Sequence, residues 1–136
     1  MRKLFTLSLL ALLFAACSDD DGPSVDMNQL TRKWYPVSAN YEGVEFPYEH
    51  GECAKDYLEF FADLTDKFVE HDECTPYIDE GTYTVSGNTI TRTDEWGDPT
   101  TVTVTRLTAT EFVIEGSDTF EGETIQFTER YVSNLN

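Results

Sequence analysis

Residues 81–93 read GTYTVSGNTITRT, and this stretch decides the fold class. Its centre, residues 86–89, holds a Gly-Asn pair that suits a tight primed turn between two antiparallel strands. If the ends of this turn pair with each other, Val85 lies opposite Ile90 on one face of the hairpin. Because β-branched and aromatic residues recur at every second position, the stretch predicts two neighbouring strands.

A second hairpin can be placed further along the chain. A three-residue loop at 107–109 puts Val104 opposite Phe112 and Val102 opposite Ile114. Threonine and glutamate residues then occupy most of the other face. One face is apolar and the other is mostly polar, as a half-buried antiparallel sheet requires.

Eight candidate strands extend outward from these hairpins. They cover about residues 33–40, 56–62, 66–71, 81–86, 89–93, 100–106, 110–116 and 123–131, after a short helical turn at 28–31. The links are mostly short, which favours a meander of antiparallel neighbours. Closure into a barrel hides the shared apolar face and removes the free edges. The predicted fold class is therefore all-β, an eight-stranded antiparallel up-and-down barrel, and a two-sheet sandwich is the alternative.

The first sixteen residues have the pattern of a signal peptide. Arg2 and Lys3 give a positive start, and an apolar run follows at 4–16. As a helix this run spans about 20 Å, which is shorter than a bilayer core of roughly 30 Å. We therefore expect residues 1–16 to be a signal peptide that is removed and not a permanent membrane helix.

The end of the apolar run predicts how the chain is processed. Residues 14–17 read FAAC and resemble a lipobox, although Phe14 stands where Leu is usual. The resemblance implies cleavage before Cys17 and attachment of lipid, including palmitate, to that cysteine. The alternative is a plain secreted protein with a free Cys17. Lipid on Cys17 would hold the protein to a membrane.

The segment 17–28 is expected to be a flexible acidic tether between the lipid and the domain at 29–136. After Cys17 it reads SDDDGPS, which cannot bury apolar surface. This run also resembles the export signal of Bacteroides-type surface lipoproteins. The resemblance implies an outer-membrane protein that faces the cell exterior, whereas a plain spacer is the alternative.

The charge of the chain excludes one class of partner. Without residues 1–16, the chain has 120 residues with 7 basic and 26 acidic side chains, a formal charge of −19. Nucleic-acid binding needs cations that neutralise phosphates, so it is excluded. Adhesion to an anionic membrane surface is disfavoured for the same reason, and anchorage is expected through the acyl chains alone.

Several short motifs, in their order and spacing, resemble a known family. They are LTRKW at 30–34, CAKDYLEF at 53–60, GTYTVSGNTI at 81–90 and FTER at 127–130. Together they resemble the lipocalin-like domain of Bacteroides-type surface lipoproteins over about residues 28–132. The resemblance implies that Trp34 opens the first strand and that Arg130 packs over it, closing one end of the barrel. Arg32 departs from the pattern, because lipocalins have Gly at that position.

The resemblance also implies a function, because the lipocalin fold commonly carries small apolar ligands. The candidate ligand-binding residues are the aromatic set expected to point inward: Trp34, Phe60, Tyr83, Phe112 and Phe127. These large rings could instead fill the interior, because an eight-stranded barrel is just wide enough to be packed or to hold one small ligand.

A second function stays open beside ligand binding. The protein could be a surface interaction module that contacts protein or glycan through its loops. The segment 42–52 carries Phe46 and Tyr48, and the segment 94–99 carries Trp96. Aromatic side chains beside polar residues suit such contacts.

Cys53 and Cys74 are expected to form a disulfide, since an exported chain with two remaining cysteines favours one. A hairpin turn at 63–64 sets the two cysteines opposite each other. The alternative is a zinc site, because His50 and His71 each precede a cysteine by three residues. We expect the disulfide, and hence no metal at His50, Cys53, His71 and Cys74.

No motif of the sequence indicates a reaction. A phosphate-binding glycine loop and a Gly-x-Ser-x-Gly elbow are both missing from the sequence. Paired carboxylates could hydrolyse glycosides, but in so acidic a chain such pairs arise by chance. The expectation is a protein that is not an enzyme and has no cofactor.

Overall fold

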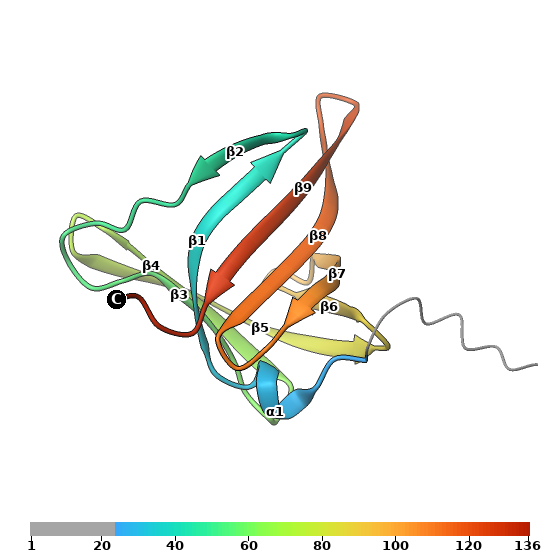
Figure 1. The fold of residues 1–136 in the computed structure, drawn as a ribbon, viewed down its shortest axis with the longest axis horizontal. Helices are drawn as coiled ribbons and strands as arrows, with labels where there is room; N and C mark the ends of the chain where they lie inside the picture. Colours follow the sequence, from blue (N-terminus) through green and yellow to red (C-terminus); the bar gives the residue numbers. More distant parts are fainter. Residues whose placement is uncertain (1–23) are drawn as a thin grey trace, which may run out of the picture.

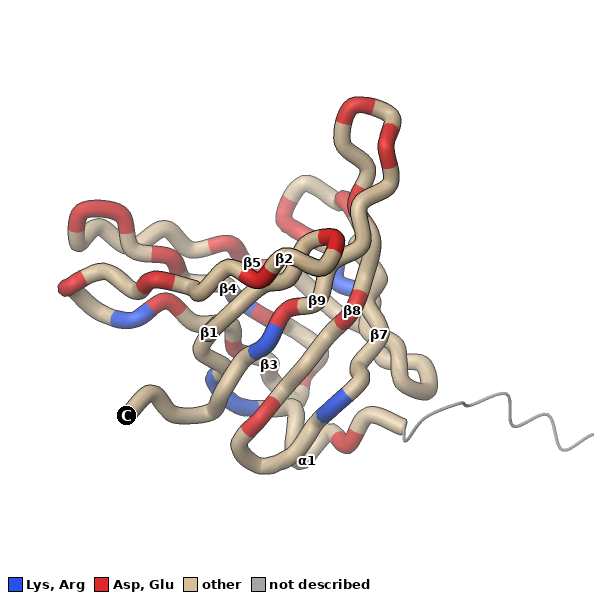
Figure 2. The backbone as a smooth tube through the Cα atoms, turned by 45° about the horizontal axis from the view of Figure 1, so that its top comes forward, with Lys and Arg blue, Asp and Glu red and all other residues tan. Residues whose placement is uncertain are grey.

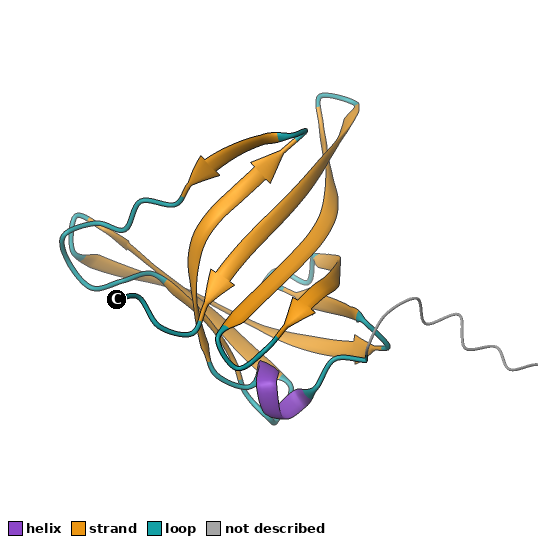
Figure 3. Cartoon of the chain, viewed as in Figure 1, coloured by secondary structure: helices purple, strands orange, loops and turns teal. Residues whose placement is uncertain are grey.

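The computed structural model describes residues 24–136, most of which lie in strands (Figures 1 and 3). The predicted signal peptide, the lipidated Cys17 and most of the tether lie outside the described residues. The elements are α1 (Met27–Leu30), β1 (Lys33–Tyr41), β2 (Val44–Pro47), β3 (Tyr57–Phe60), β4 (Thr65–Asp72), β5 (Thr75–Ser86), β6 (Thr89–Thr93), β7 (Pro99–Leu107), β8 (Glu111–Phe120) and β9 (Glu123–Val132).

The strands close into an antiparallel barrel. From β3 to β9, each strand pairs with the next one along the chain. Strand β9 returns to pair with β1, and β1 pairs with β3 through Lys33 and Trp34. Eight strands therefore form a closed ring, which confirms the predicted fold class.

Strand β2 is the one strand that was not predicted from the sequence, because it lies in a segment expected to be a loop. It pairs with the outer half of β1, where Ser38 lies opposite Pro47 and Tyr41 opposite Val44. All four of its residues are exposed, so the strand has no buried face. Only two residues of β1 pair with β3, and β2 covers the edge that β1 would otherwise leave open.

The two predicted hairpins have different outcomes. Val85 pairs with Ile90, as the Gly-Asn turn predicts. In the second hairpin Val104 pairs with Ile114, and a bulge follows before Leu107 pairs with Phe112. The predicted register there is wrong by two residues or more. Since a shift of two preserves the faces, Val104, Phe112 and Ile114 are still buried.

The end of the barrel beside α1 is packed solid. Leu30 and Trp34 have no exposed surface, and the indole N–H of Trp34 donates to the Leu30 carbonyl over 2.9 Å. The ring of Trp34 lies 5.3 Å from that of Phe112. On the opposite wall, the hydroxyl of Tyr83 donates to the carbonyl of Phe61 over 2.6 Å. Trp34 therefore closes this end, and α1 covers it (Figure 1).

The cation over Trp34 is Arg32, not Arg130. The Arg32 guanidinium carbon lies 5.6 Å from the centre of the Trp34 ring, and its Nη1 donates to the carbonyl of Ala109 over 2.6 Å. Arg130 alternates with the buried Tyr131, so it points outward and forms an ion pair with Glu111 at 3.6 Å. The prediction for Arg130 is wrong, and the residue that replaces the usual Gly supplies the contact instead.

Residues 25–136 hold every strand of the barrel and the whole of its apolar core. A segment with its own closed core and no unpaired half of a sheet is expected to fold by itself. Within the described part of the chain, no helix is both long and apolar enough to cross a membrane. Acidic residues are spread over the strands and turns, including the β4–β5 and β8–β9 hairpins (Figure 2).

Candidate ligand-binding site

Beyond the packed end, the barrel interior is hollow. A cavity of about 310 Å³ opens to solvent, and seven strands contribute side chains to its wall. The lining residues are Leu58, Phe60, Phe68, Asp79, Ile90, Arg92, Thr100, Val102, Phe112, Ile114, Phe127, Glu129 and Tyr131. The interior is thus neither fully packed by its aromatic rings nor fully open, and the alternative of a solid core holds only for the end next to α1.

Most of the wall is apolar because the inward positions of the strands alternate with outward polar ones. Ile90 lies opposite Val102 across β6 and β7. At the far end Phe127 pairs with Gly116, and a Cβ on that glycine would come within 2.6 Å of the Phe127 ring. Gly116 therefore leaves the space that the ring occupies.

An ion cluster built around the fully buried Asp66 interrupts the apolar wall. Arg92 donates from Nε to Asp66 over 2.8 Å and from Nη1 to Asp79 over 3.0 Å. Its Nη2 donates to the backbone carbonyl of Asp79 over 3.2 Å. A Cβ on Gly81 would lie 3.2 Å from this Nη2 and 2.5 Å from the Thr93 carbonyl. Gly81 thus leaves room for the guanidinium to fold against β5.

Burial governs the electrostatics of the cluster. The side chain of Asp66 has no exposed surface, and its Oδ2 accepts no hydrogen bond within the described residues. Burial raises the pKa of Asp66 above its ordinary value, although the hydrogen bond and charge of Arg92 act in the opposite direction. The pKa of Arg92 is raised, because its two carboxylate partners outweigh its own burial.

Glu129 and Tyr131 form the second polar feature of the wall. The Tyr131 hydroxyl donates to Oε2 of Glu129 through a short hydrogen bond. Burial, with the nearby Glu129 charge, raises the pKa of Tyr131 well above its ordinary value. The hydroxyl therefore keeps its proton and stays a donor, which leaves Glu129 as an acceptor at the cavity surface.

Three of the five predicted ligand-binding residues line the cavity, namely Phe60, Phe112 and Phe127. Trp34 and Tyr83 are buried in the packed end instead. There the indole N–H of Trp34 and the hydroxyl of Tyr83 each donate a hydrogen bond to a backbone carbonyl. The polar lining residues were not predicted from the sequence; they are Asp79, Arg92, Thr100, Glu129 and Tyr131. For Arg92 a signal existed, because it lies two residues from the inward Ile90 on the same strand.

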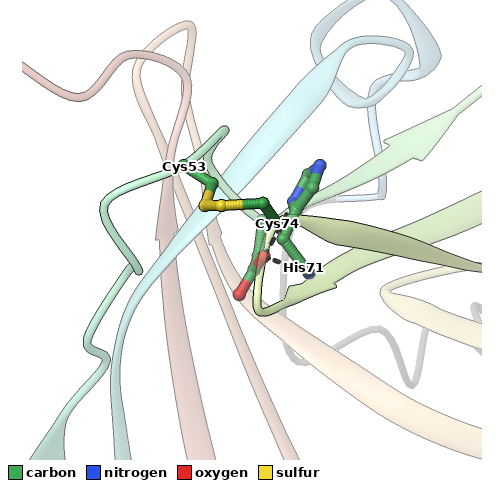
Figure 4. Close-up of a disulfide and its surroundings, with 4 residues drawn as sticks. Cys53, His71 and Cys74 are labelled. Atoms are coloured by element: carbon green, nitrogen blue, oxygen red, sulfur yellow. Dashed lines mark hydrogen bonds and ion pairs between the residues drawn. A yellow bond between two sulfur atoms is a disulfide. The ribbon is translucent and has the colours of Figure 1, made fainter.

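Cys53 and Cys74 form a disulfide, as predicted, with their Cα atoms 5.3 Å apart. It joins the segment before β3 to the β4–β5 turn, beside His71 (Figure 4). The predicted register is nevertheless wrong by one residue, since Phe60 pairs with Asp66 and not with Lys67. The bond forms all the same because both cysteines lie outside the strands, where the backbone does not follow the ladder.

The zinc alternative fails because the disulfide consumes both thiols. The two histidines have structural partners: His50 Nε2 lies 2.8 Å from the Pro36 carbonyl, and His71 Nδ1 lies 3.1 Å from Oδ1 of Asp56. Across residues 24–136, no group of three or more potential metal ligands occurs.

Asp56 is the centre of a polar network next to the disulfide. It accepts from the Tyr48 hydroxyl over 2.7 Å and from the backbone N–H of His71 over 2.8 Å. Burial acts to raise the pKa of Asp56, but these hydrogen bonds outweigh it and lower the pKa overall. Tyr48 is therefore a structural residue that fixes the loop before β3, and not the exposed contact that the sequence suggested.

Removing the disulfide tests the role of this crosslink. We expect the double substitution Cys53→Ala with Cys74→Ala to lower the free energy of unfolding by about 3 kcal/mol, as a crosslink over 21 residues stabilises by constraining the unfolded chain. Urea unfolding of the wild type under oxidising and reducing conditions is the comparison. Equal stability in both conditions, and in the variant, would contradict this role.

Comparison with known proteins places the chain in a family. The family described as a lipocalin-like domain matches residues 30–114. No curated protein sequence matches the chain. The fold is similar to that of a lipocalin-like protein from Bacteroides uniformis, with a TM-score of 0.58 and 14% identity, covering 79% of this chain and 99% of that one.

Two further solved structures share the fold. One is an uncharacterized protein from Bacteroides eggerthii, with a TM-score of 0.58 and 13% identity over 77% of this chain and 99% of that one. The other is the bovine lipocalin allergen Bos d 2, with a TM-score of 0.53 and 13% identity over 82% of this chain and 77% of that one. At these identities the likeness concerns the fold alone. Since the family match spans more than half of the sequence, the chain belongs to the lipocalin-like domain family.

Proposed function

We propose that this protein is a cell-envelope lipoprotein whose barrel binds a small, mainly apolar ligand. The observation that carries the proposal is the open cavity of about 310 Å³, whose wall is mostly apolar. Ligand pockets are typically concave and apolar with a few polar groups, and their volumes begin at about 300 Å³. The lipocalin fold is typically that of a binding protein and not of an enzyme.

The size of the cavity restricts the ligand. It suits one short acyl chain or one small ring system, not a large lipid with several chains. Each methylene group transferred from water into such a cavity contributes about 0.8 kcal/mol. Since ordering the ligand opposes binding, we expect micromolar affinity for a ligand with about ten carbon atoms.

The proposed location rests on the sequence alone. Lipid on Cys17 would anchor the chain, and the acidic tether at 18–24 would hold the barrel away from the bilayer, on the outer face of the outer membrane. Treating intact cells with a protease that cannot cross the outer membrane tests the location. Digestion of the barrel in intact cells supports exposure, and protection until the cells are lysed would refute it.

A second candidate function is contact with a surface protein or glycan. The observation that favours it is the β6–β7 turn, where Trp96 is 75% exposed. Oδ1 of Asp94 accepts from the backbone N–H groups of Trp96 and Asp98, both over 2.9 Å, and so orders the turn. An ordered turn that presents an exposed indole suits recognition. Phe46, on β2, is also exposed.

Filling the cavity tests the proposed function. We expect Val102→Phe, on the cavity wall, to weaken binding of the neutral alcohol n-decanol by about tenfold or more, because the larger side chain takes up ligand space. Isothermal titration calorimetry measures the affinity. The matched control is Val113→Phe on β8, whose neighbours Phe112 and Ile114 point inward, so that residue 113 points outward. Equal effects of both substitutions would contradict binding in the cavity.

A further inference from the structure

We propose that the cavity selects ligands that carry a positive charge, namely cationic amphiphiles with one protonated amine and one short apolar chain. This inference rests on the proposed function and names its ligand class. Two carboxylates and one guanidinium line the cavity: Asp79, Glu129 and Arg92. The apolar wall accepts the chain, and the carboxylates accept the amine.

The charge of Arg92 is already balanced by carboxylates. Its Nε, Nη1 and Nη2 each donate one hydrogen bond to Asp66 or Asp79 over 2.8 to 3.2 Å, which engages three of its five N–H groups. An anionic head group at this wall would meet the charges of Asp79 and Glu129 beside a guanidinium that already has two counter-ions. The cluster thus presents a neutralised guanidinium and surplus negative charge, because Asp66 lies behind Arg92 as a further carboxylate.

Glu129 offers an acceptor to a cation. The Tyr131 hydroxyl occupies its Oε2, which leaves Oε1 as an acceptor at the cavity wall. In Asp79, Oδ2 accepts from Arg92, and Oδ1 is closed off from solvent and accepts no hydrogen bond within residues 24–136, so Asp79 contributes its charge. An ammonium group has three donors, so it can donate to Glu129 while the charges of both carboxylates attract it.

The aromatic rings of the wall favour the same sign of charge. Phe68, Phe127 and Tyr131 line the cavity together with the carboxylates. Ring faces attract cations, especially where water is excluded. The formal charge of −17 for the whole chain also attracts cations before they bind. Four observations therefore point to one ligand class: the neutralised guanidinium, the free acceptor of Glu129, the rings and the overall charge.

The test compares three probes with the same ten-carbon chain at neutral pH: n-decylammonium, n-decanol and n-decanoate. Isothermal titration calorimetry on residues 24–136 gives their affinities. We expect decylammonium to bind about tenfold tighter than decanol or better, and decanoate to bind more weakly than decanol. Glu129→Gln should bring the affinity for the amine to within about threefold of the affinity for the alcohol, with both probes measured on the same variant.

Glu115→Gln is the matched control, because this exposed residue on β8 points outward and its substitution changes the net charge equally. It should leave the preference for the amine unchanged. Equal binding of all three probes, tighter binding of decanoate, or equal effects of the two substitutions would overturn the inference while leaving the apolar cavity proposal intact. Failure of every probe to bind would overturn the proposed function, and the inference with it.

Discussion

Replacing Arg92 by methionine is expected to lower the free energy of unfolding by about 3–5 kcal/mol at neutral pH. The substitution keeps much of the apolar stem but leaves Asp66 and Asp79 without their counter-ion. Asp66 is fully buried, so its charge cannot regain water. Urea unfolding followed by circular dichroism measures the loss. The control is Arg106→Met, because Arg106 is exposed and pairs with Glu111 at the surface, where such pairs contribute less than about 1 kcal/mol.

The loss should depend on pH in one direction. The pKa of Asp66 is already raised in the folded protein, so ionisation of this group opposes folding as the pH rises through its folded pKa. Without Arg92 the folded pKa rises further. The variant should therefore be closest to the wild type below about pH 3, where Asp66 is mostly protonated in both the folded and unfolded chains. A loss of stability that is equal at about pH 3 and about pH 7 would contradict the ion cluster as the cause.

A companion variant separates the charge from the packing. Adding Asp66→Asn to Arg92→Met removes the buried charge that has lost its partner. We expect this double variant to recover part of the stability at neutral pH and to show a weaker pH dependence than Arg92→Met alone. No recovery would indicate that Arg92 acts through packing.

The substitution Trp34→Ala is expected to cost a similar amount, about 3–5 kcal/mol. Trp34 has no exposed surface, packs against Phe112 and donates to the Leu30 carbonyl, which ties α1 to the barrel end. The cavity left behind would lie among the buried residues of the packed end. Circular dichroism in urea measures the loss, because the substitution removes one of the two tryptophans on which a fluorescence signal would depend.

Trp96→Ala is the control for size and residue type. Trp96 is 75% exposed, so its removal should change stability by no more than about 0.5 kcal/mol. If both tryptophan variants unfold at the same urea concentration as the wild type, Trp34 does not close the barrel.

A milder change, Trp34→Phe, should keep most of the packing and lose mainly the hydrogen bond to Leu30, which should lower the free energy of unfolding by about 1–3 kcal/mol.

The sequence predicts those features of the barrel that depend on residues close together along the chain. The Gly-Asn turn sets the pairing of Val85 with Ile90, and the period of two sets which side chains point inward. The bulge after Val104 and the β1–β2 pairing do not follow from the sequence. They depend on contacts between strands whose local residues look the same in either arrangement.

The candidate site shows a similar division. Inward aromatic residues could be identified, but not which of them border the cavity, since Trp34 and Phe112 are both buried aromatic residues at inward strand positions and only Phe112 lines the cavity. The ion cluster was missed because Asp66, Asp79 and Arg92 come from three separate strands, and a charged residue at an inward position is uncommon. The cation over the Trp34 ring is Arg32 and not Arg130, because Arg130 lies on the outer face of the barrel wall and its side chain cannot reach a ring inside the barrel.

The central claim is that the barrel binds an apolar ligand inside its cavity, and methyl nuclear magnetic resonance tests it directly. Carbon–proton spectra of residues 24–136 would be recorded while n-decanol is added. We predict saturable shifts for the methyl groups of Leu58, Ile90, Val102 and Ile114, which line the cavity. The methyl groups of Ile78 on the surface should stay unchanged. Unchanged cavity methyl groups up to the solubility limit of the alcohol, or shifts confined to surface methyl groups, would contradict the claim.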